Sequence, residues 1–262
     1  MKAKSFTFLI PFPFVIMSSF DCMSLLNSFN LILQSSSGPV EAWADLLWEI
    51  GYALCHQISS RSLFMGGMQF PVCARDTGTM LGFGIVLLFF IFNHRKKRSG
   101  LPDIPTLIVC AFGLMIFAFD GVSSYLGFRE TNNEWRLTSG LIMGLSLGIM
   151  LLTVMARLLG GKEDKRCFTF KDLFILAPFF FLAYFATKID LGGLGWYLIS
   201  SFIIISLISL ILIIMQIFLR SILWGKKEWS EQRIMLFSVI LTAGTIFLLW
   251  LFHRLTETSI PH

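Results

Sequence analysis

Two short polar stretches interrupt a chain that is otherwise rich in Phe, Leu and Ile, and the first contains residues that bind metals. Cys55 and His56 are adjacent, and Cys73 and Asp76 lie at the start of the next apolar segment. Two thiolates, an imidazole and a carboxylate form a ligand set that suits Zn²⁺ or another borderline transition metal. The sequence also allows a Cys55–Cys73 disulfide in an oxidising compartment, or ordinary packing. Metal site, disulfide and packing therefore stay open as three interpretations.

The second stretch begins with Asp120, near the end of an otherwise apolar segment. A carboxylate within a membrane span costs a few kcal/mol unless it is paired, so Asp120 is either half of an ion pair or a functional acid. The sequence does not decide whether the protein is an enzyme. If it is one, His56 and Asp120 are the candidate acid or base. The polar network around Asp120 continues with Glu130, Asn132 and Asn133.

Arginines accompany both stretches. They are Arg61, Arg75, Arg129 and Arg136. Because arginine binds phosphate through two parallel hydrogen bonds, this set is a candidate for binding an anion or a phosphorylated lipid head group; a solvated polar cap is the alternative. We also expect Arg75 or Arg136 to contact Asp120, since an arginine partner offsets much of the cost of a buried carboxylate. That contact would form the floor of a pocket roofed by Cys55 and His56.

The composition of the chain indicates a membrane protein. Of 262 residues, 55% are hydrophobic and 14% charged, and the mean hydropathy is +0.75. The apolar residues come in blocks of about 20, the length of a helix that spans a bilayer, which excludes an ordinary soluble domain. We expect an all-α fold, a polytopic helical membrane protein with about seven transmembrane helices in a lipid bilayer. The net charge of +5 lies in clusters between the blocks, so it indicates topology and no nucleic-acid partner.

The apolar blocks give seven predicted spans and three regions. The spans are 5–27, 72–92, 104–124, 137–159, 172–187, 195–219 and 234–253. A helix on the outer membrane face is expected before the second span, where Trp43, Leu46 and Leu47 recur at helical spacing and the pattern ends near Gln57. The regions are an N-terminal anchor, 1–33, a motif-bearing core, 41–160, and a three-helix extension, 168–262. Glycines four residues apart predict close packing of the second and fourth spans: Gly78, Gly82, Gly140, Gly144 and Gly148.

Basic residues set the expected orientation. They gather in the turns after the second, fourth and sixth spans, so the positive-inside rule places the N-terminus in the cytoplasm and both polar stretches on the extracytoplasmic side. The membrane would be the cytoplasmic or inner membrane of a prokaryote. Lys2 and Lys4 before the first apolar run also fit a signal peptide. Cleavage after Ser19 would match the usual small-residue rule poorly, which favours an uncleaved anchor.

Three classes of function fit these residues. The leading one is a non-transporting membrane protein whose outer-face site binds a metal ion or a phosphorylated lipid. The second is a membrane-embedded enzyme that acts on a lipid or a lipid-linked substrate. A transporter ranks last, because few polar residues fall at the bilayer midplane. The oligomeric state is not predicted.

Both polar stretches carry motifs of a known family. The segments CHQ, PVCARDTG, DG and RETNN, with Arg61 and Arg136 between and after them, resemble an uncharacterised prokaryotic family of predicted membrane proteins, a domain of unknown function, over roughly 48–148. Asp76 stands where the family has the second cysteine of a CxxC, and Ser124 where it has a glutamine. A dithiol cycle within CxxC is therefore excluded, although Asp can still ligate zinc. The resemblance implies a membrane location and a core built from paired motifs, and it supplies no reaction.

Overall fold

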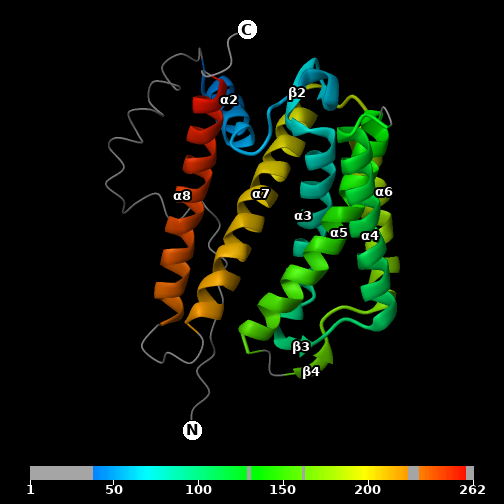
Figure 1. Cartoon of the computed structure of the whole chain (residues 1–262), viewed down its shortest axis with the longest axis vertical. Helices are drawn as coiled ribbons and strands as arrows, with labels where there is room; N and C mark the ends of the chain where they lie inside the picture. The colour runs from blue at the N-terminus through cyan, green and yellow to red at the C-terminus, as the bar shows by residue number, and fades with distance from the viewer. Residues whose placement is uncertain (1–37, 129–130, 161–162, 224–229, 258–262) are drawn as a thin grey trace. The chain divides into compact units, whose positions relative to one another are not determined.

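The computed structural model describes residues 38–128, 131–160, 163–223 and 230–257. Most of them belong to α-helices (Figure 1). The helices are α2 (Pro39–Tyr52), α3 (Ala74–Phe92), α4 (Ile104–Tyr125), α5 (Asn133–Leu158), α6 (Phe170–Ala186), α7 (Gly192–Ile222) and α8 (Glu231–Glu257). The predicted first span, 5–27, lies outside the described residues, as do Arg129 and Glu130.

Five of the described helices are long and apolar enough to cross a membrane: α3, α4, α5, α7 and α8. Each coincides with a predicted span. Helix α6 coincides with the short fifth span; its 17 residues reach roughly 25 Å, slightly less than the hydrocarbon core of about 30 Å. The predicted fold class, a polytopic helical membrane protein, is confirmed.

Glycines allow α3 and α5 to pack with their backbones almost in contact. A side chain at Gly78 would overlap the backbone of Leu137, and a side chain at Gly144 would overlap that of Thr79. Helix α4 packs on α5, and α7 packs on both α3 and α8. The close packing predicted from the glycine spacing is therefore confirmed.

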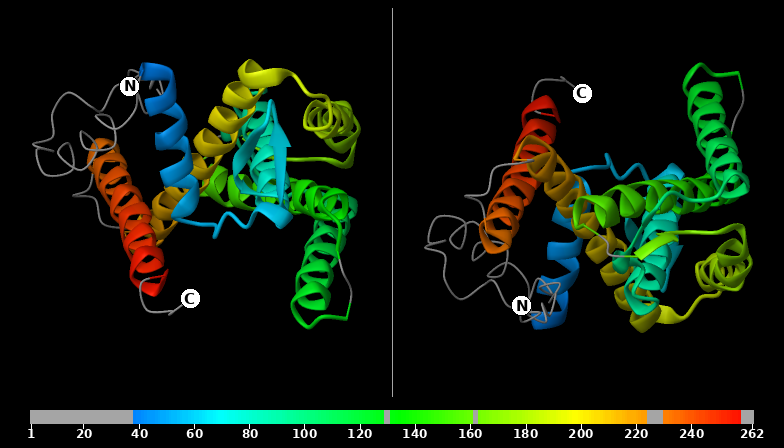
Figure 2. Two further views of the ribbon diagram at one scale, coloured as in Figure 1. Left: turned by 90° about the horizontal axis from the view of Figure 1, so that it is seen from above. Right: turned by 90° about the horizontal axis from the view of Figure 1, so that it is seen from below.

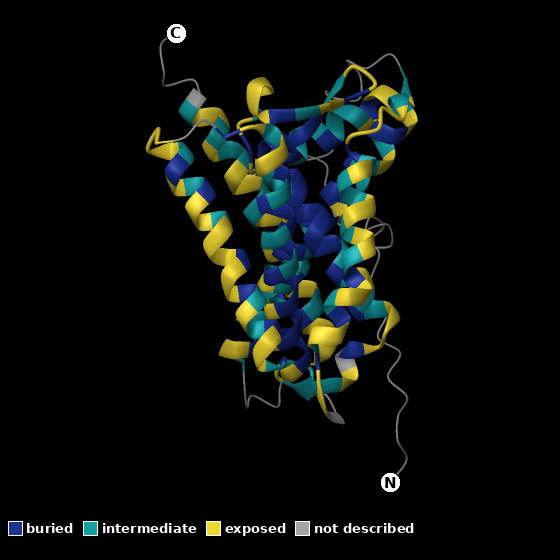
Figure 3. Cartoon of the chain, turned by 90° about the vertical axis from the view of Figure 1, so that its right-hand side faces the viewer, coloured by how far each residue is buried: buried dark blue, intermediate teal, exposed yellow. Residues whose placement is uncertain are grey.

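Burial follows this arrangement. Figure 3 shows buried residues along the inner sides of the helices and exposed residues on their outer faces. Helix α4 illustrates the pattern, because one side of it exposes apolar residues at helical spacing, namely Ile108, Phe112, Met115 and Phe119. Such a face suits contact with lipid tails.

A β-hairpin lies across the N-terminal end of α3 (Figure 2). Its antiparallel strands are β1 (Ser62–Met65) and β2 (Met68–Cys73). Gly66 and Gly67 form the turn with φ values of 57° and 77°, a conformation that glycine adopts without strain. Two predicted boundaries change as a result. Helix α3 begins at Ala74 instead of at residue 72, because residues 71–73 belong to β2, and the preceding helix ends at Tyr52 instead of near Gln57.

A buried ion pair joins the other end of α3 to α6. Arg95 donates from Nη1 to Asp172 Oδ2 at 3.0 Å and from Nη2 to Oδ1 at 2.6 Å, and Nη1 also donates to the carbonyl of Cys167 at 3.0 Å. Close to this pair, β3 (Arg98–Gly100) and β4 (Glu163–Arg166) run parallel. These contacts fix where α6 begins relative to the core helices.

Candidate functional site: a thiol and carboxylate cluster

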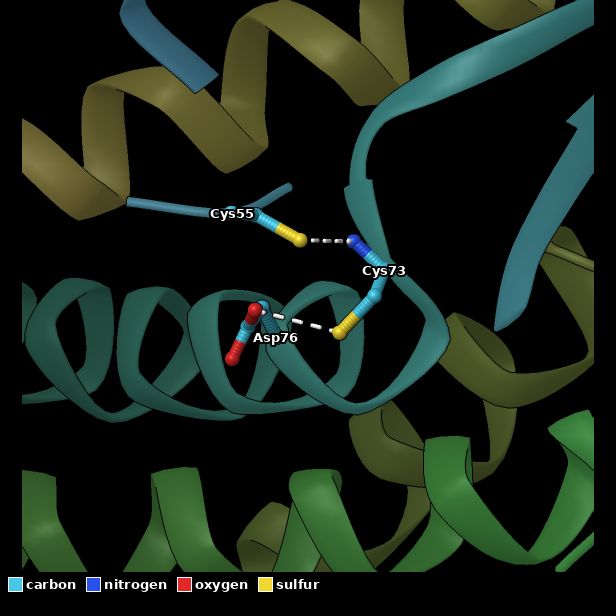
Figure 4. A group of neighbouring side chains, drawn as sticks. All are labelled: Cys55, Cys73 and Asp76. Atoms are coloured by element: carbon cyan, nitrogen blue, oxygen red, sulfur yellow. Dashed lines mark hydrogen bonds between the residues drawn. The ribbon is translucent and has the colours of Figure 1, made fainter. Parts of the chain in front are cut away.

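Cys55, Cys73 and Asp76 lie together where the hairpin meets α3 (Figure 4). Cys73 is the residue immediately before α3. Its backbone N–H donates to Cys55 Sγ at 3.2 Å, and its thiol donates to Asp76 Oδ2 at 3.1 Å. The two sulfurs and one carboxylate oxygen all lie within 4.8 Å of one another. Both cysteines are free thiols, so the disulfide that the sequence also allowed is not formed in this structure.

The two thiols differ in electrostatic environment. Interaction with the neighbouring Cys73 thiol lowers the pKa of Cys55, against the opposing effects of burial and of the Asp76 charge. The same interaction raises the pKa of Cys73, and burial and the Asp76 carboxylate raise it further. At neutral pH the Cys73 thiol therefore keeps its proton and donates it to Asp76. A metal ion would have to displace this proton in order to bind the sulfur.

Side-chain amides position the segment that carries Cys55. Gln57, which has a φ of 52°, donates to the carbonyls of Trp48 at 2.8 Å and Pro71 at 3.0 Å. Gln69 of β2 donates back to the Gln57 carbonyl at 2.7 Å. These bonds hold the segment after α2 against β2. The sequence analysis predicted no role for either glutamine. The chain reverses direction after α2 to reach the hairpin, and this reversal is the feature that requires such hydrogen bonds.

His56 does not join the cluster. Its ring is exposed and lies against His253 of α8, with centroids 4.5 Å apart. Among the described residues, the group able to hold an ion contains Cys55, Cys73 and Asp76. Three of the four predicted ligands therefore lie together, and His56 is not among them because its ring lies against His253 instead. Sequence reasoning gave no role to His253, which offers no local signal.

Asp120 forms the ion pair expected between the two polar stretches. Arg75 donates to Asp120 Oδ2 from Nε at 2.9 Å and from Nη2 at 2.6 Å, and Ser139 of α5 donates to the same oxygen at 3.1 Å. The carboxylate is completely buried, and Oδ1 has no hydrogen-bond partner among the described residues. The predicted contact with Arg75 is confirmed. Its burial favours the ion-pair interpretation over that of a solvent-exposed acid.

The start of α5 joins the second stretch to the hairpin. Asn132 caps α5 by accepting from the Trp135 N–H at 2.8 Å. Asn133 donates to the carbonyl of Ser62 at 3.0 Å and accepts from Arg136 Nη1 at 3.2 Å. Arg136 in turn lies within electrostatic range of Arg61, Arg75, Asp120 and Cys73. Arg75 and Arg136 thus lie within electrostatic range of cluster residues, and Arg61 within range of Arg136; Arg129 lies outside the described residues.

The apolar helices identify the chain as an integral membrane protein, and comparison with known proteins gives its family. A family described as "Predicted membrane protein (DUF2085)" matches residues 55–150, which include both polar stretches. An uncharacterised protein of Methanothermobacter thermautotrophicus is 32% identical over 98 residues, 37% of this chain and 83% of that protein. An uncharacterised protein of Methanocaldococcus jannaschii is 28% identical over 116 residues, 44% of this chain and 72% of that protein. The chain belongs to this family of membrane proteins of unknown function. No solved structure matches it.

Proposed function

We propose that this protein binds a metal ion on its extracytoplasmic face through Cys55, Cys73 and Asp76. The proposal rests on one observation: the two sulfurs and a carboxylate oxygen lie within 4.8 Å of one another. Around a tetrahedral zinc with bonds of about 2.3 Å, two sulfurs lie roughly 3.8 Å apart. Small side-chain movements would therefore close the three groups around an ion. Zn²⁺ fits this mixed sulfur and oxygen set, as do other borderline transition metals.

Three ligands leave one position of a tetrahedral ion open. Zinc sites with three protein ligands keep the fourth position for water or substrate, whereas structural sites are closed by four. Two thiolates and a carboxylate also leave an excess of negative charge around a divalent ion. Arg75 lies within electrostatic range of Asp76, and Arg136 within range of Cys73, so both arginines stabilise the loaded cluster.

Metal analysis of the full-length protein, purified in detergent without chelator, tests this proposal. We expect stoichiometric zinc, and thiolate-to-metal absorption after replacement by Co²⁺. Cys73→Ser and Asp76→Ala should both lower the metal content. Cys110→Ser, which removes another buried free thiol, should leave it unchanged. Two results would refute the proposal: metal content insensitive to Cys73→Ser, or a Cys55–Cys73 link in non-reducing mass analysis of the untreated protein.

The arginines support a second candidate function, recognition of a phosphate group such as that of a lipid head group. Arg136 lies within electrostatic range of both Arg61 and Arg75, and Asp120 already pairs with Arg75. Among the described residues this leaves more positive than negative charge next to the cluster. Arginine clusters of this kind bind phosphate through charge-assisted hydrogen bonds.

Binding to vesicles separates lipid phosphate from free phosphate. Purified protein should bind vesicles that contain phosphatidic acid more tightly than vesicles of phosphatidylcholine alone, and Arg136→Gln should reduce the difference. Lys97→Gln, which removes an exposed charge after α3, serves as the control. Competition by inorganic phosphate alone would indicate a site for the free anion. Equal binding to both vesicles, with no competition by phosphate, would exclude this function.

The orientation of the chain is part of the proposal. Basic residues cluster after the C-terminal ends of α3 and α5, which supports a cytoplasmic location for those ends and for the N-terminus. The thiol cluster would then face outward. Phe64 and Phe128 are exposed near the two polar stretches, so Phe64→Cys and Phe128→Cys should react with a membrane-impermeant thiol reagent in intact cells. Lys97→Cys should react only after the cells are opened, and the reverse pattern would invert the orientation.

A further inference from the structure

Two histidines from distant parts of the chain lie against each other beside the thiol cluster. The rings of His56 and His253 have centroids 4.5 Å apart and are tilted by 57°. His56 directly follows Cys55 and is exposed, whereas His253 lies near the C-terminal end of α8 and is half-buried. His253 is also outside the residues 55–150 that the family model matches. One histidine of the pair therefore lies within the matched region, and the other lies on α8 outside it.

A backbone hydrogen bond sets the tautomer of His253. Its Nδ1 lies 2.6 Å from the carbonyl oxygen of Tyr52. Because a carbonyl can only accept, Nδ1 carries the hydrogen, and Nε2 of the neutral ring keeps its lone pair. Histidines that ligate metals usually donate their other ring N–H to a carbonyl or carboxylate, which orients the ring and makes the ligating nitrogen more basic. His253 is thus held in the tautomer that allows ligation through Nε2.

The charges next to the two rings are balanced. Arg254 follows His253 and donates from Nη2 to Glu49 Oε1 at 3.1 Å and Oε2 at 3.3 Å. Trp250 of the same helix donates to Glu49 Oε2 at 2.7 Å. The Arg254 guanidinium therefore has a carboxylate partner. A divalent cation at the two rings would not face an unpaired positive charge from this arginine.

We propose that His56 and His253 bind a divalent transition-metal ion at an exposed site separate from the thiol cluster. Imidazole nitrogens suit Cu²⁺, Zn²⁺ and Ni²⁺, with Cu²⁺ binding most tightly. Metal–nitrogen bonds of about 2.0–2.1 Å place two rings that share an ion roughly 4.5–5 Å apart between centroids. The two rings already have this separation, and the exposed His56 side chain can turn a nitrogen toward the ion. Solvent completes the coordination.

Copper binding in a chain without the two cluster thiols tests the histidine pair apart from the thiol cluster. The full chain carrying Cys55→Ser and Cys73→Ser can neither bind Cu²⁺ through these thiols nor reduce it with them. Electron paramagnetic resonance should show nitrogen ligands from two imidazoles. Adding His56→Gln or His253→Gln should remove one of these ligands and weaken copper binding by about tenfold or more. His94→Gln, which removes an exposed imidazole beyond the other end of α3, is the matched control and should change neither quantity.

Chemical modification extends the test to the unsubstituted chain. Zn²⁺ should slow the reaction of both His56 and His253 with diethyl pyrocarbonate, measured residue by residue by mass spectrometry, and should not protect His94. Unchanged copper binding after His253→Gln, an equal loss after His94→Gln, or no zinc protection of either histidine would overturn the inference. The copper outcomes are independent of the thiol cluster, because that measurement omits both cysteines. Loss of metal by the cluster alone leaves the histidine site standing.

Discussion

Removing the Asp120 carboxylate should destabilise the protein through the arginine that it leaves behind. In Asp120→Ala, the Arg75 guanidinium loses both hydrogen bonds to Oδ2 but stays beside Phe117, whose ring centroid lies 5.8 Å from the arginine Cζ atom. Breaking a fully buried ion pair by removing one partner costs about 3–5 kcal/mol. Because the Arg75 side chain is still 22% exposed, solvent offsets part of this cost. We expect a loss of about 2–3 kcal/mol in the free energy of unfolding.

The measurement is reversible unfolding in mixed detergent micelles, followed by far-ultraviolet circular dichroism. Glu134→Ala is the matched control, since it breaks an ion pair with Lys188 in which the glutamate side chain is 63% exposed; it should cost less than about 1 kcal/mol. The double variant Arg75→Ala, Asp120→Ala should be more stable than Asp120→Ala alone, because no unpaired charge remains. An Asp120→Ala loss no larger than the control, or a double variant that loses the sum of both single changes, would refute the reasoning.

Three further predictions concern packing, the second buried ion pair and metal affinity. Gly144→Ala should reduce the folded fraction recovered in detergent, judged by size-exclusion chromatography, because the new methyl group overlaps the backbone of α3, whereas Gly121→Ala, with open space around it, should not. Asp172→Ala should lower the free energy of unfolding by about 3–5 kcal/mol, since it leaves Arg95 buried and unpaired; a loss below that of Glu134→Ala would contradict this. Zinc affinity, measured by competition with a chelating dye between pH 6 and 8, should rise with pH, because the raised pKa of Cys73 keeps a proton on the thiol that zinc must displace. The slope should approach about tenfold per pH unit for each proton released, and Cys73→Ser should flatten it.

The sequence alone predicted the features that depend on long runs of apolar residues or on the depth of a residue in the membrane. Apolar blocks of helical length predicted α3, α4, α5, α7 and α8, because a bilayer demands about 20 apolar residues for each crossing. A spacing of four between glycines predicted which faces of α3 and α5 meet. Asp120 and Arg75 could be paired because both occur near the same end of neighbouring spans, and a buried carboxylate requires a partner.

Features that depend on chain reversals, or on contacts between residues far apart in the sequence, were not predicted. Gly66 and Gly67 between two apolar runs are a known hairpin signal, but the apolar run after them also fits a membrane span, which gives an expected helix from residue 72. The hairpin instead moves the start of α3 to Ala74. His253 is far from His56 in the sequence, and no local pattern indicates that α8 ends beside the segment after α2. The position of the His56 side chain therefore depends on tertiary packing alone.

The first turn of α3 connects the two candidate sites. Asp76 points toward the thiols, whereas its neighbour Arg75, about 100° around the helix, points toward α4 and contacts Asp120. Gly140 allows this turn to lie directly against α5, where any side chain would overlap the Arg75 carbonyl. The ion pair and the glycine contact thus fix the rotation of α3 about its axis, and that rotation determines where Cys73 and Asp76 point. In the proposed metal site, Asp120 would therefore support binding without touching the ion, by holding the helix that begins directly after Cys73 and carries Asp76.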